Sequence, residues 1–257
     1  MRFCAVFALL LVATPWISQA KTLVSVCYEG YGMSPFISAG SDGDQPAGLL
    51  VDMLEAAAAP LDITLQFQQA PWLRCQKMVQ ENKLNATLAM IWSPQRALEF
   101  RFPDPQSGTE QSERYLWQAQ YPVFHPITKS FVKAKYQPQF GISAPLGYIV
   151  ERWLLHKGWL SPYKFKLDEG LRMVADGKLD GYSVERFIGS HHLRQLGLED
   201  KIAASSDNLL IEKWFLVFNQ QYYQQNQQLV EQFWLNIGHA RQVLEARFPY
   251  ADSGSTP

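Results

Sequence analysis

Hydrophobic and polar positions follow two different periods in the first third of the chain. Alternating apolar side chains, rich in β-branched residues, predict strands, and apolar side chains three or four positions apart predict helices. The predicted elements are a strand at 22–28, a helix at 48–59, a strand at 63–69, a helix at 72–81 and a strand at 85–92. This order is typical of a parallel, doubly wound unit.

The same periods continue beyond a polar, proline-containing boundary at 102–108. The predicted elements there are strands at 114–121, 140–143, 179–184 and 214–219, and helices at 148–156, 168–175, 187–196 and 222–248. Strands and helices therefore alternate through most of the chain, which predicts an α/β fold.

One eight-residue pattern occurs twice, at 78–85 and at 173–180. Both copies read Met-Val-x-x-[Asn/Gly]-Lys-Leu-[Asn/Asp]. In each copy a helix is expected to end at the residue that tolerates a left-handed backbone, and a short strand follows. The repeat predicts two similar α/β lobes with a cleft between them, where a small ligand would bind. A chance match of eight residues is the alternative.

Composition narrows the class of partner. The chain has 257 residues, of which 47% are hydrophobic and 18% charged, and its formal net charge is -1. This size allows a packed core in one or two domains. Because basic residues are not in excess, we do not expect nucleic acid to be a partner.

Residues 1–20 have the pattern of a signal peptide. Arg2 precedes an apolar run at 3–12, and Ser-Gln-Ala at 18–20 is a small-x-small cleavage site before Lys21. No later apolar stretch has the length of a membrane span. We therefore expect a mature protein that begins near Lys21 and is soluble outside the cytoplasm.

The cysteines agree with an oxidising compartment. Cys4 leaves with the signal peptide, and Cys27 and Cys75 remain as an even pair. Such a pair favours a disulfide, and two buried thiols are the alternative. A zinc site is not predicted, because two cysteines without a nearby histidine cannot complete a tetrahedral shell.

Five motifs carry a resemblance to a known family. They are Ser-Pro-Phe at 34–36, Gly-Leu-Leu-Val-Asp-Met-Leu at 48–54, Pro-Trp-Leu-Arg at 71–74, Ser-Pro-Gln-Arg at 93–96 and Lys-Leu-Asp-Gly-Tyr-Ser-Val-Glu at 178–185. In the order and spacing of these motifs the chain resembles the type II periplasmic solute-binding proteins. More narrowly, it is similar to the family-3 group that serves polar amino-acid ABC transporters.

The resemblance implies a two-lobed, periplasmic-binding-protein-like II fold, in which each lobe has a mostly parallel doubly wound sheet. Residues 21–108 together with 210–257 would form lobe one, and residues 109–209 lobe two. A two-segment hinge, at about 106–115 and 206–214, would let the lobes close around a small solute. The implied protein is a periplasmic monomer that delivers its ligand to an ABC permease or to a membrane receptor.

The resemblance also implies a set of ligand-binding residues. Arg96, at a strand-to-helix turn, would bind the carboxylate of an amino acid, and Glu185 would bind its ammonium group. A surface ion pair is the alternative for Arg96, and a pair with Arg186 is the alternative for Glu185. The carboxylate and the guanidinium would then face each other across the cleft.

Aromatic residues complete this predicted site. Trp72 and Tyr31 would form walls around the ligand, and Trp92 and Tyr148 would line the cleft. Core packing is the alternative for Trp72, and partial core packing is the alternative for Trp92. A Cys27–Cys75 disulfide would connect the loop of Tyr31 to the helix of Trp72.

Two departures from the family pattern leave the ligand open. The stretch Gly-Ile-Ser-Ala-Pro-Leu-Gly-Tyr at 141–148 lacks the hydroxyl pair that grips the carboxylate in amino-acid binders, and its Pro145 lacks a backbone donor. The strand before Arg96 is one residue shorter and lacks the Ser/Thr that commonly contacts the ammonium. The ligand could therefore be an amino acid, a modified amino acid, a small peptide or another small carboxylate.

Two alternative functions are compatible with the implied fold. One is a cyclohexadienyl dehydratase-like enzyme in which Glu185 would act as general acid, and the other is an orphan periplasmic sensor. The sequence contains no nucleophile–base set, no phosphate-binding loop and no Gly-x-Gly-x-x-Gly. We therefore predict a binding protein without catalysis, cofactor or metal.

Overall fold

The computed structural model describes residues 21–30, 32–38, 40, 45–103 and 113–246, so the predicted signal peptide lies outside the described residues. The strands are β1 (Thr22–Tyr28), β2 (Ile63–Gln69), β3 (Ala86–Ile91), β4 (Phe100–Arg101), β5 (Trp117–Pro126), β6 (Ile142–Ser143), β7 (Gly181–Ser183) and β8 (Ile202–Asn219). The helices are α1 (Leu49–Ala58), α2 (Trp72–Gln80), α3 (Pro94–Glu99), α4 (Ile149–His156), α5 (Leu167–Ala175), α6 (Arg186–Leu196), α7 (Gln220–Gln225) and α8 (Gln227–Glu245), with 3₁₀ turns η1 (Ala59–Leu61) and η2 (Lys133–Lys135).

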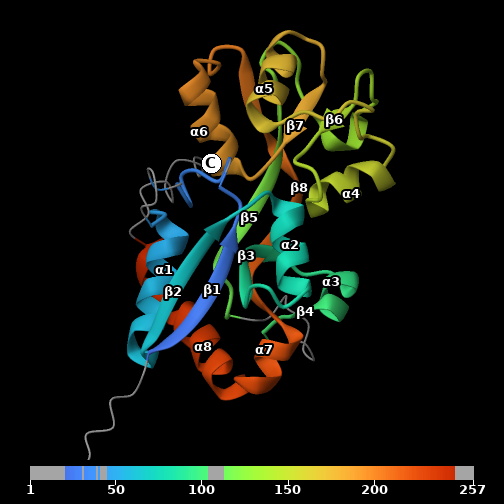
Figure 1. The fold of residues 1–257 in the computed structure, drawn as a ribbon. Coiled ribbons are helices and arrows are strands. Elements are labelled where there is room, and N and C mark those ends of the chain that lie inside the picture. Colours follow the sequence, from blue (N-terminus) through green and yellow to red (C-terminus); the bar gives the residue numbers. More distant parts are fainter. Residues whose placement is uncertain (1–20, 31, 39, 41–44, 104–112, 247–257) are drawn as a thin grey trace, which may run out of the picture.

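These elements form two groups at opposite ends of one twisted sheet (Figure 1). The strand order is β2-β1-β3-β8-β5-β7-β6, and β4 pairs with β8. We call the group with α1, α2, α3, α7 and α8 lobe one, and the group with α4, α5 and α6 lobe two. The two-lobed α/β fold predicted from the sequence is confirmed.

Lobe one is built around β1, which lies between β2 and β3 and is parallel to both. Apolar side chains of α1 and α8 pack on one face of this sheet, with Leu54 and Trp234 fully buried there. The other face is covered by α2, whose Val79 belongs to a second buried cluster with Phe215. The predicted strands at 22–28 and 63–69 coincide with β1 and β2.

Lobe two has a smaller sheet. β6 and β7 are parallel, and β5 pairs with β7 in the antiparallel direction. The α5 and α6 helices lie at the far end of this lobe, and α4 lies on the side that faces α3 (Figure 1). The mostly parallel sheet expected for lobe two is thus limited to the β6–β7 pair.

The two lobes are connected by β5 and β8, which run antiparallel to each other from one lobe to the other (Figure 1). Their register shifts on either side of Pro122. The predicted strand at 214–219 is only the end of β8, because Ser205, Ser206 and Asp207 interrupt the apolar pattern that precedes it. Part of the other predicted hinge segment, 106–112, lies outside the described residues.

The repeated pattern has the same backbone geometry in both lobes. Asn82 and Gly177 end their helices with left-handed φ values of 57° and 67°. In each lobe the following lysine N–H then donates to the carbonyl of the repeat's methionine, over 2.8 Å in lobe one and 2.9 Å in lobe two. Both copies of the repeat therefore end their helix in the same way before the following strand.

The last residue of each copy fastens the next strand to its neighbour. The Asn85 side-chain oxygen accepts from the backbone N–H of Ser25 over 2.8 Å. The Asp180 carboxylate accepts four hydrogen bonds through one oxygen, from the Tyr136 hydroxyl and from the backbone N–H groups of residues 139–141. Equivalent positions in the two copies thus carry equivalent structural roles.

The C-terminal helical region is divided in two. The predicted helix at 222–248 is interrupted at Asn226, whose φ of -131° lies outside the helical range. Among the described residues, no helix combines the length and the apolar character that a membrane span needs.

Candidate ligand-binding site

A cleft of about 690 Å³ lies between the two lobes. Lobe one lines it with the loop after β1 and the turn before α2, and lobe two lines it with the loops before α4 and α5 and with β7. Most of the lining is apolar, and its charged side chains are Glu29, Lys164 and Lys166. This volume lies in the range of small-molecule sites. We call this space the outer cleft.

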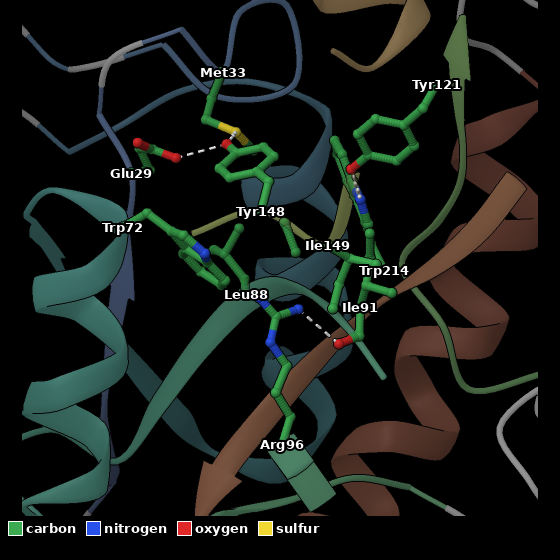
Figure 2. Close-up of a pocket in the computed structure, with 11 residues that line it drawn as sticks. Glu29, Met33, Trp72, Leu88, Ile91, Arg96, Tyr121, Tyr148, Ile149 and Trp214 are labelled. Atoms are coloured by element: carbon green, nitrogen blue, oxygen red, sulfur yellow. Dashed lines mark hydrogen bonds between the residues drawn. The ribbon is translucent and has the colours of Figure 1, made fainter. Parts of the chain in front are cut away.

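A second cavity, of about 20 Å³, adjoins the outer cleft (Figure 2). The two spaces share Glu29, Trp72 and Tyr148, so these side chains form the partition between them. The smaller cavity also reaches Tyr121 of β5 and Trp214 of β8, whose Nε1–H donates to the Tyr121 hydroxyl over 2.9 Å. We call it the inner pocket.

Arg96 lies at the inner pocket, where the sequence predicted a ligand-binding guanidinium. The start of α3 places it there, because the Ser93 hydroxyl caps this helix by accepting from the Arg96 backbone N–H. Its side chain is only 4% exposed and donates to the Ile91 backbone carbonyl over 2.9 Å (Figure 2). It also donates to the Gly147 carbonyl over 3.1 Å.

The charge of Arg96 is not balanced by an ion pair within the part of the chain that the structure describes. Burial, with a smaller contribution from the nearby Arg152, lowers the pKa of Arg96 to about 10, so the group stays protonated at neutral pH. No ion pair among the described residues includes Arg96. The guanidinium also lies 5.6 Å from the centre of the Trp72 ring. The surface ion pair considered as its alternative is therefore not formed.

Glu29 supplies a half-buried acidic group at the same pocket. It directly follows β1, and its carboxylate accepts from the Tyr148 hydroxyl over 2.6 Å. Burial raises the pKa of Glu29 to about 7, although hydrogen bonds from Tyr148 and from the Trp72 backbone oppose the rise. No cation among the described residues forms an ion pair with it.

The sequence interpretation did not include Glu29 in the site. One signal for it was present, because Glu29 is a carboxylate at the C-terminal end of a parallel strand, where ligands of open α/β sheets bind. The alternating pattern of β1 could not show that the next side chain turns into the cleft.

The peptide group of Gly147 is one of the contacts between the lobes. The Gly147 carbonyl in lobe two accepts from both Arg96 and the Trp72 Nε1–H in lobe one, the latter over 3.3 Å. Gly147 has a φ of 80°, and a Cβ added to it would overlap the Leu73 side chain. Only glycine therefore fits this close approach without strain.

Glu185, the predicted partner of the ammonium group, lies outside both cavities. Its carboxylate caps α6, accepting from the backbone N–H groups of Phe187 over 2.7 Å and Ile188 over 3.1 Å. Burial raises its pKa to about 7. Among the described residues it forms no ion pair with Arg186 and does not face Arg96 across the cleft. The capping of α6 explains this placement.

The other predicted residues are divided between the cleft and the core. Trp72 and Tyr148 line both cavities, with their rings edge to face and 6.1 Å apart. Trp92 is half-buried against a core cluster and lines neither cavity. Tyr31 lies outside the described residues.

The predicted disulfide is present and borders the site. Cys27 near the end of β1 is bonded to Cys75 in α2, with the two Cα atoms 5.4 Å apart. The bond therefore joins the strand that precedes Glu29 to the helix that begins with Trp72. Among the described residues, no group of three or more His, Cys, Asp or Glu side chains is arranged to hold a metal ion.

Comparisons with solved structures show the same fold. A histidine kinase sensor domain with similarity to periplasmic binding proteins is 16% identical, with a TM-score of 0.72, covering 90% of this chain and 96% of that one. An ancestral arginine-binding protein bound to glutamine is 14% identical, with a TM-score of 0.69, covering 92% and 100%. The GluR0 ligand-binding core from Nostoc punctiforme in complex with L-glutamate is 14% identical, with a TM-score of 0.66, covering 89% and 99%.

Sequence comparison identifies the family. A comparison with curated proteins found no significant match. The family of bacterial extracellular solute-binding proteins, family 3, matches residues 25–216, which is most of the chain. The two lobes, the cleft between them and this match lead to one conclusion: the chain belongs to the bacterial extracellular solute-binding proteins of family 3.

Proposed function

We propose that the protein binds a small zwitterionic solute, an amino acid or a close derivative, for uptake by an ABC-type transporter. One observation carries this proposal: the inner pocket is lined by the buried guanidinium of Arg96 and the half-buried carboxylate of Glu29, and neither forms an ion pair among the described residues. Buried charges without partners are costly. A zwitterion would neutralise both of them at once.

The chemistry of each contact follows from the group that makes it. The Arg96 guanidinium can bind a carboxylate through two parallel N–H···O bonds, which are stronger than its bonds to neutral carbonyls. The Glu29 carboxylate can accept from an ammonium group and thereby exchange a neutral hydroxyl donor for a charged one. The Trp72 ring offers a flat wall beside both charges.

Binding without catalysis is part of the proposal. The dehydratase alternative rested on Glu185 as the general acid, and Glu185 is turned toward the start of α6 and is only 1% exposed. Solute-binding proteins of this family are typically not enzymes. The signal-peptide pattern at 1–20 supports export to the periplasm, where the protein would act as a monomer.

A thermal-shift screen against the twenty L-amino acids, dipeptides and small carboxylates tests the proposal. A solute at a hundred times its Kd adds about 2.7 kcal/mol to the free energy of unfolding. For a chain of this size that is a rise of roughly 5–10 °C in Tm. We expect Arg96→Gln and Glu29→Gln each to abolish the rise.

Arg172→Gln and Glu169→Gln are matched controls, because both side chains are exposed on α5 and line neither cavity. They should leave the rise in Tm unchanged. A solute that stabilises Arg96→Gln and Glu29→Gln as much as the original protein would refute the assigned site. Loss of uptake of that solute by cells lacking the protein would establish transport, and unchanged uptake would favour a sensor.

A further inference from the structure

The inner pocket has almost no free space in this conformation. Its volume of about 20 Å³ holds roughly one water molecule and is far too small for an amino acid. The space between Arg96 and Glu29 is occupied by the rings of Trp72 and Tyr148 (Figure 2). A zwitterion that reaches both charges must therefore move at least one of these rings.

Tyr148 makes the contacts that a solute would make. It enters from lobe two, at the residue before α4, and its hydroxyl donates to Glu29 over 2.6 Å. Its ring packs edge to face on Trp72, and its hydroxyl lies 3.7 Å from the Met33 sulfur. The neighbouring Gly147 carbonyl meanwhile accepts from Arg96. Residues 147 and 148 thus satisfy both charged groups with neutral partners.

Trp72 is the less movable of the two rings. It is 7% exposed, belongs to a buried cluster that includes Cys75 and Val79, and is held by its Nε1–H bond to Gly147. Tyr148 instead follows a short loop, and it also borders the outer cleft, where about 690 Å³ could receive its ring. Movement of Tyr148 toward the outer cleft opens the inner pocket and gives up the contact of its ring with Trp72.

We propose that Tyr148 is a built-in competitor of the solute, whose phenol fills the ligand site when the lobes are in contact and is displaced by the solute into the outer cleft. This inference rests on the proposed function and assigns Tyr148 a role in specificity. Displacement exchanges two hydrogen bonds in which only one partner is charged for two in which both partners are charged. Only a solute that carries both charges regains both contacts, so Tyr148 discriminates against neutral and singly charged molecules.

The first test probes occupancy and needs no knowledge of the solute. p-Cresol has the shape of the tyrosine side chain, and Tyr148→Ala should leave a matching cavity that binds it. We expect p-cresol to raise the Tm of Tyr148→Ala but not that of the original protein or of Tyr163→Ala, a control at an exposed tyrosine. If p-cresol fails to stabilise Tyr148→Ala more than the control, the phenol does not occupy such a site.

The second test measures competition by titration calorimetry with the twenty L-amino acids. A competitor lowers the apparent affinity by the fraction of time that it fills the site. We therefore expect Tyr148→Ala to bind the preferred amino acid about tenfold more tightly than the original protein, and Tyr148→Phe to show a smaller gain because it keeps the ring. Unchanged or weaker binding by Tyr148→Ala would overturn the role of competitor.

The two proposals can fail separately. Suppose that p-cresol binds Tyr148→Ala, whereas no amino acid binds any variant or displaces p-cresol. Tyr148 then occupies the inner pocket, and the proposed solute class is wrong. If an amino acid binds the original protein and depends on Arg96 but does not bind Tyr148→Ala more tightly, the proposed function holds and Tyr148 is a wall of the site.

Discussion

Glu29 brings a titrating charge to the site at physiological pH. Its pKa of about 7 results mainly from burial, and Tyr148, which faces it, keeps its proton because burial and Glu29 raise the Tyr148 pKa well above 10. Arg96 remains protonated throughout the neutral range. Glu29 is therefore the group in the inner pocket whose ionisation changes near neutral pH.

We predict that affinity for a zwitterionic solute rises as pH increases from 6 to 8. An ammonium group binds only the ionised form of Glu29, and the ionised fraction increases about tenfold over this interval for a pKa of about 7. Calorimetric titration at several pH values should show a Kd that falls by about tenfold. Glu29→Gln should bind more weakly without this dependence. A pH-independent Kd for the original protein would show that Glu29 does not bind the ammonium group.

Folding stability should have the opposite pH dependence at the same residue. The pKa of Glu29 is raised above its unfolded value of 4.5, so its contribution is largest below that value and is lost as pH rises through 7. The residue is thus less favourable for folding in the ionised form that binding requires. Function and stability conflict here, as is common at binding sites.

At the residue scale, the direction of the Glu185 side chain could not be predicted from the sequence. Its position at the end of a lobe-two strand was compatible with a cleft-facing carboxylate and with a helix cap, and sequence does not fix the direction of a side chain. Its carboxylate accepts from two backbone N–H groups of α6. Arg96, whose position follows from the cap of α3, lines the inner pocket, and its role in binding stays a prediction. Its contact with Gly147 depends on the meeting of two lobes.

At the scale of elements, local patterns predicted most strands and helices. β1 and β2 match their predicted ranges because one side of each follows a regular apolar alternation and proline or glycine marks the flanks. β8 is much longer than predicted, since pairing with β5 holds its polar residues in the strand. Long-range pairing of this kind leaves no local signal.

The Cys27–Cys75 disulfide is the covalent link between two elements that border the site. It closes a loop with a sequence separation of 48. We predict that the double variant Cys27→Ala/Cys75→Ala loses about 4 kcal/mol of unfolding free energy, because the unfolded chain regains the freedom that the bond removes. Urea denaturation of the variant measures this loss. A midpoint equal to that of the original protein would contradict it, and reduction of the original protein should reproduce the loss.

At the scale of the whole molecule, the lobes meet through a few directional contacts. Trp72 and Arg96 of lobe one both donate to the Gly147 carbonyl, Tyr148 donates to Glu29, and α3 and α4 are joined by a bond between Arg152 and Gln95. Closure of two lobes through such contacts can be changed by a small perturbation at one of them.

Gly147→Ala is predicted to hold the lobes apart. The new Cβ would lie 2.4 Å from the end of the Leu73 side chain and 3.4 Å from the Trp72 ring, so the Leu73 side chain has to turn away at the contact, and the left-handed backbone of residue 147 adds strain. Gly158→Ala is a matched control, because Gly158 has a similar φ of 68° but no atom within 4 Å of the added Cβ. Small-angle X-ray scattering should show a larger radius of gyration for Gly147→Ala alone. Equal values for the two variants would contradict the role of Gly147 as the point of contact.

The central claim is that the protein binds its solute through both charges, with the carboxylate at Arg96 and the ammonium group at Glu29. The most direct measurement is the Kd, by titration calorimetry, of two ligands: the tightest-binding L-amino acid and the amine that lacks its carboxylate. Each ligand is titrated into the original protein and into Arg96→Gln. We predict that loss of the carboxylate weakens binding at least about thirtyfold in the original protein and only slightly in Arg96→Gln. An equal effect in both proteins, or the absence of binding by any amino acid, would contradict the account.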